Sequence, residues 1–365
     1  LGAGETIGKR GVGGLTARQD DIIRAYDDAI SRIIAIRPDV CLHSGDLFHQ
    51  VRPSNRILAV ASAGLNRLAS EAGIPTIIIT GNHDAPRLAQ SWAALEVFRT
   101  IDNLRIAASD GVHTYTIGDT TFHAVPHSTG ETSIREFVES CQPSRSTHHN
   151  VLITHGVVAG MPEFAMAELG EQEFPIDTLN RFDYVALGHY HNFARVAERA
   201  YYAGSTERLS QSERDFAKGF VEIVLDPFDI RFHEVPSRGM ATVRLPDMSG
   251  KRGDEIGEMI AAQAVRAGAS DNIVRLIVPG ISRESLKTLP SDLIAELKKS
   301  SFALDIRFES SSAESLPSPT TLHEGIGRLD EAFVAFLDRS ELSHEDKARL
   351  RASALQYLRA IDDES

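Results

Sequence analysis

Four short apolar segments of this chain each run directly into residues that can bind a metal ion. They are residues 40–42 before Gly45-Asp46, 77–79 before Gly81-Asn82-His83-Asp84, 151–154 before His155-Gly156, and 185–187 before Gly188-His189-Tyr190-His191. Short apolar runs rich in Val and Ile predict buried strands. Because ligands bind beyond the carboxyl ends of strands in α/β sheets, four such ends side by side would bring these polar residues together. Each motif alone fits an ordinary turn, but all four in this order indicate one site.

Helices are predicted between the first strands, which indicates a layered α/β domain. The expected helices are 18–36, 53–71 and 88–99. Gly118-Asp119 predicts a hairpin between two strands, at 113–117 and 121–125. Antiparallel strands are expected at 200–203, 219–225 and 229–234. The first domain, residues 1–236, is expected to close near Pro236.

Residues 237–310 are predicted to form a smaller α+β domain. Its expected strands are 241–245, 272–278 and 302–308, and its expected helices are 253–267 and 291–299. A stretch rich in Ser and Pro predicts a linker at about 311–324. Residues 325–365 are then expected to form a helical C-terminal segment, with helices at 327–338 and 344–360.

Bulk composition limits the class of protein. With 365 residues, the chain is too long for one ordinary core and suits two domains, or one large domain with an appendage. The net charge of −13 argues against a generally basic nucleic-acid binder, although bound divalent cations reverse the sign locally. The 2 cysteines suit a reducing cytoplasm rather than a disulfide framework. No signal peptide is visible, and no apolar run approaches the roughly 20 residues of a membrane span.

The side chains after the four strands favour one kind of metal chemistry. Imidazole and carboxylate ligands suit Mn, Fe, Zn, Ni or Co, and the absence of a thiolate argues against structural zinc. A carboxylate can bridge two ions roughly 3.5–4 Å apart, and such a pair acidifies water and orients a phosphate. In an extended segment His189 and His191 would point the same way, which suits two neighbouring ions.

These segments resemble the calcineurin-like metallophosphoesterase superfamily, whose motifs run Asp-x-His, Gly-Asp, Gly-Asn-His-[Asp/Glu], a His and Gly-His-x-His. Residues 45–49 (GDLFH) followed by Arg52-Pro53-Ser54 resemble the SbcD-type, or meiotic-recombination-eleven, double-strand-break repair nucleases. Residues 202–208 (YAGSTER) are similar to another segment of that family, with Ala203 where the family has Pro. The resemblance covers about residues 1–240 and implies a layered β-sandwich flanked by helices, with a smaller α+β capping domain.

The resemblance implies a role for each matching residue. Asp46 would bridge two divalent ions, expected to be Mn²⁺, while Asn82, His155 and His189 would complete the site of one ion and His191 would bind the other. His83 would contact the scissile phosphate and help to protonate the leaving oxygen, and His49 would lie near the same phosphate. Asp84 would orient His83 or its loop, or cap the turn.

The family places its Asp-x-His motif immediately before a Leu-Gly pair, and this sequence starts at Leu1-Gly2. We expect the motif to precede Leu1 in a longer gene product. The alternative is a protein without it, in which the His191 ion would lack ligands and catalysis would be crippled.

Partners follow from the resemblance and from exposed-looking charges. Five basic residues are candidate contacts to DNA phosphates, with a solvated surface as the alternative: Lys9, Arg10, Arg18, Arg52 and Arg56. Arg208 favours a structural role, and His127 is a weaker candidate for the edge of the site. The C-terminal helices would bind the coiled coil of an SbcC-type ABC ATPase or pack on the chain itself. A homodimer is expected through 53–71 and 88–99.

The sequence thus predicts a two-metal DNA nuclease, acting as exonuclease or endonuclease on DNA ends in double-strand-break repair. Two alternatives stay open. One is a related phosphodiesterase or phosphatase that acts on small esters. The other is a catalytically dead scaffold that binds DNA ends or the ATPase.

Overall fold

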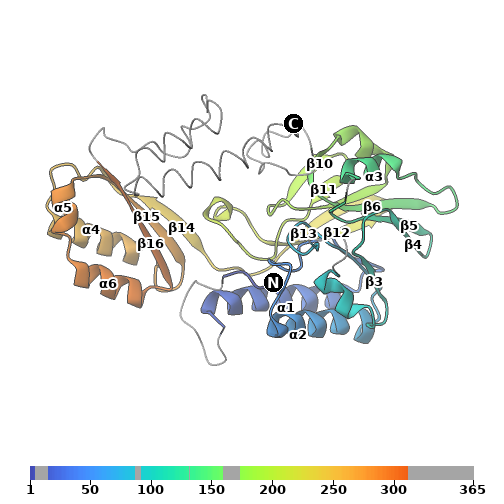
Figure 1. The fold of residues 1–365 in the computed structure, drawn as a ribbon, viewed down its shortest axis with the longest axis horizontal. Helices are drawn as coiled ribbons and strands as arrows, with labels where there is room; N and C mark the ends of the chain where they lie inside the picture. Colours follow the sequence, from blue (N-terminus) through green and yellow to red (C-terminus); the bar gives the residue numbers. More distant parts are fainter. Residues whose placement is uncertain (5–14, 87–91, 131, 159–172, 311–365) are drawn as a thin grey trace, which may run out of the picture.

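The computed structural model describes the chain except for residues 5–14, 87–91, 131, 159–172 and 311–365. Its described residues form two units along the long axis of the molecule, and the strand β14 (Met240–Arg244) leads from the larger to the smaller (Figure 1). The predicted linker at 311–324 and the predicted helices at 327–338 and 344–360 lie outside the described residues.

The first sheet of the larger unit is parallel and has the strand order β1-β2-β3. Its strands are β1 (Cys41–His43), β2 (Thr76–Ile79) and β3 (Leu104–Ala107). The helices α1 (Ala17–Ile36) and α2 (Asn55–Leu65) pack against one face of this sheet. In that layer, Ile78 of β2 contacts a cluster that includes Tyr26, Ile30 and Leu65.

The second sheet has the order β10-β11-β9-β6-β5-β4. Its strands are β4 (His113–Ile117), β5 (Thr120–Val125), β6 (His149–His155), β9 (Tyr184–Gly188), β10 (Ala194–Ala197) and β11 (Ala200–Tyr202). Its outer face is covered by α3 (Ile134–Ser140) and the 3-10 helix η4 (Ile176–Arg181). The minor strands β7 (Val157–Val158) and β8 (Glu173–Phe174) form a separate pair.

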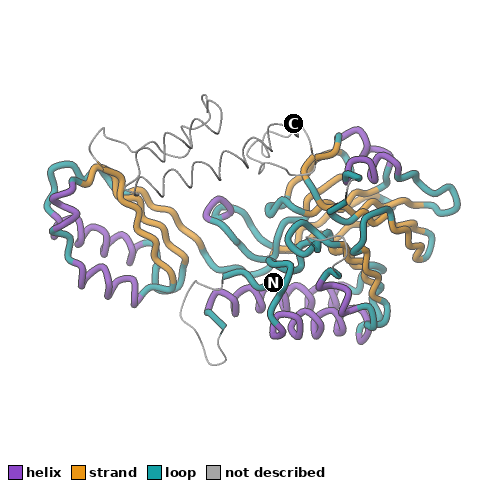
Figure 2. The backbone as a smooth tube through the Cα atoms, viewed as in Figure 1, coloured by secondary structure: helices purple, strands orange, loops and turns teal. Residues whose placement is uncertain are grey.

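The two sheets pack face to face. Side chains alternate along a strand, so Ile77 and Ile79 point away from the helices and toward Ala124 and Ile153 of the second sheet. The antiparallel pair β12 (Gly219–Leu225) and β13 (Phe228–Glu234) packs against the same core. The predicted layered β-sandwich with flanking helices is confirmed (Figure 2).

The smaller unit has its own parallel sheet and its own core. Its strands follow the order β14-β15-β16, with β15 (Ile273–Ile281) in the centre and β16 (Ala303–Ser310) at one edge. The helices α4 (Gly253–Arg266), α5 (Arg283–Lys287) and α6 (Ser291–Ser300) lie on one side of the sheet (Figure 1). Ile256, Ile260, Val274 and Leu276 are fully buried between α4 and the sheet. A smaller unit of strands and helices is present as predicted, and its sheet is parallel.

Several local predictions differ from the structure. No α-helix occupies the described part of 88–99; only the 3-10 helix η2 (Ala94–Phe98) forms there. The apolar residues of the segment 92–99 do not share one buried face, because the side chains of Trp92 and Val97 are 84% and 59% exposed. The helix predicted at 53–71 is α2, capped by Ser54, followed by a π-helix, η1 (Asn66–Glu71). β11 runs parallel to β9, and its antiparallel partner β10 was not predicted.

Among the described residues, none of the helices combines the length and the apolar character that crossing a membrane requires.

Candidate metal centre

The strand ends singled out in the sequence meet at one edge of the sandwich, and they come from both sheets. Asp46 follows β1 and Asn82 follows β2 in the first sheet. His155 ends β6, and His189 follows β9 in the second sheet. The centre therefore lies across the seam between the two sheets, which explains how residues far apart in the sequence converge.

Glycines make this convergence possible, because backbone lies where a side chain would otherwise be. A Cβ atom on Gly188 would lie 1.8 Å from the carbonyl oxygen of Ser44, and one on Gly81 would lie 2.2 Å from Oδ1 of Asp46. Gly45 has φ of +90°, a conformation that favours glycine. The strand ends thus approach so closely that Gly188 and Gly81 have no room for a side chain.

A Gly188→Ala variant is therefore expected to disrupt the centre. The added methyl group must push against rigid backbone, and overpacking of this kind costs about 1–3 kcal/mol. We expect a lower midpoint of thermal unfolding together with weaker binding of divalent metal in calorimetric titration. The control is Gly257→Ala in α4, where the nearest neighbour is a side-chain carbon of Pro290 at 3.1 Å. Wild-type metal affinity in Gly188→Ala would contradict the close-approach argument.

Four ligand atoms face one another at the centre. One ligand atom from each of Asp46, His155 and His189 lies within 4.8 Å of the other two. The Oδ1 atom of Asn82 lies 2.9 Å from Nε2 of His155 and 3.3 Å from Nδ1 of His189. The Nε2 atom of His155 also lies 3.3 Å from Oδ2 of Asp46. This set of nitrogen and oxygen donors fits a divalent transition metal.

The tautomer of His155 supports this fit. Its Nδ1 atom lies 2.7 Å from the carbonyl oxygen of Ser44, which can only accept, so Nδ1–H donates and Nε2 offers its lone pair to the centre. Burial alone would lower the pKa of His155, but the adjacent Asp46 carboxylate outweighs burial and raises it. Positive charge is therefore favoured between Asp46 and His155, where a metal ion would lie.

Asp46 adopts a left-handed backbone conformation, with φ of +57°. Its Oδ1 atom accepts a hydrogen bond from the backbone N–H of His83 at 2.9 Å. Burial would raise the pKa of Asp46, but the neighbouring His155 and the N–H of His83 keep it well below its usual range. Asp46 is thus an ionised carboxylate whose second oxygen is directed at His155.

Asp84 fastens the two loops that carry Asp46 and Asn82. It is fully buried, and its Oδ1 atom accepts from Gly81 N at 2.6 Å while Oδ2 accepts from Leu47 N at 2.8 Å. It therefore both caps its own turn and orients the preceding loop. Burial, followed by the charge of Asp46, raises the pKa of Asp84 to about 7.

His83 and His49 stack on each other beside the centre, with ring centroids 5.3 Å apart and an interplanar angle of 19°. The Nδ1 atom of His83 lies 3.2 Å from the carbonyl oxygen of His49 and therefore donates to it. The Nε2 atom of His83 is left to exchange a proton with a bound group. His83 is half-buried and His49 is exposed, so both are accessible to a ligand.

His191 does not join the group formed by Asp46, His155 and His189. The expectation that His189 and His191 point the same way from an extended segment is wrong, because His189 has φ of +107° and β9 ends at Gly188. Instead, the Nδ1 atom of His191 lies 3.1 Å from Oε1 of Glu213. Glu213 belongs to no motif in the sequence, and its contact with His191 was not predicted.

His127 lies closer to the centre than its weak sequence signal suggested. Its ring approaches that of His155 edge-on, with centroids 6.4 Å apart, and its backbone N–H donates to Thr80 O at 3.0 Å. Burial, and then the charge of His155, lowers the pKa of His127 to about 4. A neutral imidazole therefore borders the site.

The same stretch of sequence matches a known family. Residues 16–193 match the family model described as calcineurin-like phosphoesterase. Over these residues, which are just under half of the chain, the sequence is similar to calcineurin-like phosphoesterases. The match includes all six candidate residues of the strand-end motifs: Asp46, Asn82, His83, His155, His189 and His191.

Three relatives of this chain share the description DNA double-strand break repair protein Mre11. The protein from Haloferax volcanii is 32% identical over 244 residues, which are 65% of this chain and 52% of the relative. The protein from Methanocaldococcus jannaschii is 28% identical over 64% of this chain and 65% of its own length. The protein from Methanococcus maripaludis is 29% identical over 56% of each chain. The chain thus spans between about half and two thirds of these relatives.

The predicted DNA contacts of the chain differ in accessibility. Lys9 and Arg10 lie outside the described residues. Arg52 and Arg56 are exposed, and their contact with DNA stays a prediction. Arg18 is only 2% exposed, and the prediction that it contacts DNA is wrong.

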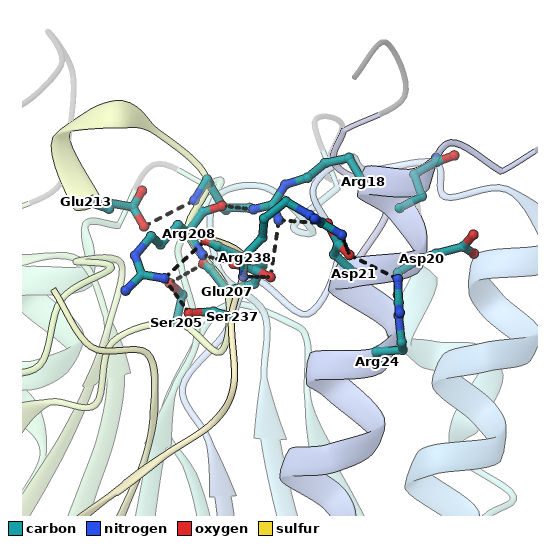
Figure 3. A network of polar contacts seen from close by, with 12 residues as sticks. Arg18, Asp20, Asp21, Arg24, Ser205, Glu207, Arg208, Glu213, Ser237 and Arg238 are labelled. Atoms are coloured by element: carbon teal, nitrogen blue, oxygen red, sulfur yellow. Dashed lines mark hydrogen bonds and ion pairs between the residues drawn. The ribbon is translucent and has the colours of Figure 1, made fainter. Parts of the chain in front are cut away.

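Arg18 belongs instead to a buried charge network (Figure 3). Its Nη1 atom lies 3.1 Å from Oε2 of Glu207 and 3.5 Å from Oδ2 of Asp21, and its Nη2 atom donates to the carbonyl oxygen of Arg208. Arg238 pairs with the same Asp21 at 2.7 Å. These contacts tie the first turn of α1 to the segment after β11 and to the approach to β14.

Arg208 has the structural role expected of it. Its Nη1 atom donates to Ser237 Oγ at 2.6 Å and to the carbonyl oxygen of Arg238 at 3.2 Å, and Nη2 donates to Phe216 O at 2.9 Å. Arg208 therefore connects its own segment to Phe216 and to the residues Ser237 and Arg238.

Proposed function

We propose that this protein is a metal-dependent DNA nuclease that processes the ends of double-strand breaks. The observation that carries this proposal is the convergence of Asp46, Asn82, His155 and His189 on one point, next to the stacked His83 and His49. DNA as substrate is supported by the relatives, whose name is DNA double-strand break repair protein Mre11.

We propose two divalent ions, with Mn²⁺ as the expected metal. Asp46, Asn82, His155 and His189 would hold one ion, and Asp46 and His191 would contribute to the other. Bound metal acidifies a water molecule and neutralises charge on the phosphate during in-line hydrolysis.

The residues of the chain would then divide the remaining tasks. Asp84 keeps the loops of Asp46 and Asn82 in register through its bonds to Leu47 N and Gly81 N. His83, whose Nδ1–H is engaged by His49 O, would use Nε2 to contact the scissile phosphate and protonate the leaving oxygen. His49 would support the ring of His83 by stacking and face the same phosphate.

A His83→Ala variant is expected to bind metal like the wild type but to lose cleavage by about 100-fold to 10,000-fold, the usual contribution of general acid catalysis. Metal content measured by mass spectrometry and Mn²⁺-dependent degradation of linear duplex DNA give the two readouts. His148→Ala is the matched control, because the His148 side chain is exposed and its ring lies beside that of His149, with centroids 4.6 Å apart. Full cleavage by His83→Ala would refute the assigned role.

The substrate class is tested by comparing substrates under the same conditions. Linear duplex DNA should be degraded in the presence of Mn²⁺ far faster than a small chromogenic phosphodiester is hydrolysed. A preference for the small ester would instead favour a general phosphodiesterase, and inactivity on both with metal bound would favour a scaffold. A mixture of the Asp46→Ala variant and DNA serves as the control for contaminating nucleases.

We further propose the setting in which this nuclease acts. Residues 1–236 would be the nuclease domain, 237–310 the capping domain, 311–324 a linker and 325–365 the segment that binds the coiled coil of an SbcC-type ABC ATPase. The exposed Trp92 and Val97 lie on the surface expected to form a homodimer. Arg52 and Arg56 would contact DNA phosphates, and the protein would be cytoplasmic.

A further inference from the structure

A buried ion pair lies directly behind His191. The Nζ atom of Lys218 is 2.6 Å from Oε2 of Glu213, and the side chains are 0% and 6% exposed. Buried charges of this kind are costly unless they are paired and hydrogen-bonded. The carboxylate of Glu213 also accepts from Leu209 N at 3.2 Å and from Ser210 Oγ at 3.1 Å, which fixes its orientation.

The pair contacts His191 at two points. Glu213 Oε1 lies 3.1 Å from Nδ1 of the His191 ring, while Lys218 Nζ donates to the His191 carbonyl oxygen at 2.6 Å. Lys218 also donates to Oδ1 of the next residue, Asn192, at 3.1 Å. One buried pair thus holds both the backbone and the ring of His191.

The contact fixes which ring nitrogen is available. An ionised carboxylate only accepts hydrogen bonds, so the Nδ1 atom of His191 carries the proton and Nε2 keeps its lone pair. Lys218 keeps Glu213 ionised by compensating its charge inside the protein. Carboxylates that bind the other nitrogen of a metal-ligating histidine orient the ring and strengthen metal binding.

We propose that Glu213 and Lys218 are positioning residues that present Nε2 of His191 to the second metal ion. This inference rests on the proposed metal-dependent function. Both residues lie in the segment between β11 and β12. Glu213 contacts the ring of His191, and Lys218 contacts the backbone of His191 and the side chain of Asn192. The His191 ring would therefore already be oriented before the second metal ion binds.

The direct test is the tautomer of His191 in the metal-free protein. Two-bond ¹H–¹⁵N correlation spectra of ¹⁵N-histidine-labelled protein at about pH 8.5, well above the usual imidazole pKa, should show His191 protonated at Nδ1. Glu213→Ala should lose that tautomer. An Nε2-protonated His191 in the wild type, or an unchanged tautomer in Glu213→Ala, would overturn the proposal.

A double variant guards against misfolding. Glu213→Ala leaves the Lys218 ammonium buried without its carboxylate, whereas Glu213→Leu with Lys218→Met removes both charges at similar volume, a change that buried pairs often tolerate. The folded double variant should lose the Nδ1 tautomer. Mn²⁺ titration of this variant followed by electron paramagnetic resonance should show about 10–100-fold weaker binding of one ion only. Equal weakening of both ions would contradict a role confined to His191.

The two proposals fail separately. A wild type that shows the Nδ1 tautomer and binds metal but cleaves no DNA would refute the nuclease function and leave the positioning role standing. A wild type that cleaves DNA with His191 in the other tautomer would refute the positioning role alone.

Discussion

A His155→Ala variant is expected to lose tight binding of divalent metal and nearly all cleavage. His155 is fully buried and contributes Nε2 at the point where Asp46 and Asn82 also converge. A metal ion supplies several kcal/mol of charge stabilisation in the transition state, and since each 1.36 kcal/mol is a factor of ten, we expect a loss of about 1000-fold or more. The effect should exceed that of His83→Ala on metal content, because His83 is assigned to the phosphate.

The measurement combines metal content, Mn²⁺ titration and the rate of DNA degradation with circular dichroism to confirm folding. The matched control is His233→Ala, since His233 lies in β13 and pairs with Glu222 at 2.7 Å, away from the centre. If His155→Ala retained stoichiometric metal and wild-type cleavage, the assignment of the centre would be wrong. Loss of folding in His155→Ala would move the test to His155→Gln, which keeps more of the buried volume.

An Arg18→Met variant is expected to destabilise the fold by about 3–5 kcal/mol, the usual effect of leaving a buried charge without its partner. Arg18 and Glu207 are each only 3% exposed in their side chains, and Arg18 also lies between Glu207 and Asp21. Methionine fills much of the volume but leaves Glu207 without its cation. Urea unfolding followed by circular dichroism measures the change in the free energy of unfolding.

Arg24 provides the matched control for this variant, because it pairs with the same Asp21 at 3.0 Å but is 70% exposed. Arg24→Met should change stability by about 0–1 kcal/mol, as exposed ion pairs do. Equal effects of the two substitutions would show that burial of the network contributes nothing. Replacing Glu207 by Gln in the Arg18→Met background should recover part of the loss, since the uncompensated charge is then removed.

The metal centre was predictable because its signal is local. Each motif lies at the end of an apolar run, so the sequence predicts that Asp46, Asn82 and His155 lie at strand ends. The same runs predicted a layered α/β domain, and the resemblance to calcineurin-like phosphoesterases implied the β-sandwich. What the local pattern did not contain was the positive φ of His189, which tertiary packing of the strand ends imposes.

Residues whose partners lie far along the chain were harder to interpret. Arg18 looked like a surface cation on α1, because nothing nearby indicates that Glu207 pairs with it. Glu213 and Lys218 were missed for the same reason, although a Glu and a Lys five residues apart before an apolar strand offer a weak signal. The helix predicted at 88–99 was wrong for a different reason. Trp92 and Val97 are apolar yet exposed, so the spacing of apolar residues does not reflect burial there.

The position of the centre across two sheets has a consequence for the order of folding. The contacts of its residues span 111 positions between His155 and Ser44, 73 between His155 and Asn82, and 107 between His189 and Asn82. Closing such long loops costs entropy before the contacts form, so the ligand set is assembled only when the two sheets have docked. Metal that binds this set stabilises the native state over all partly folded ones. Metal uptake during refolding should therefore lag behind the formation of secondary structure and report the docking of the sheets.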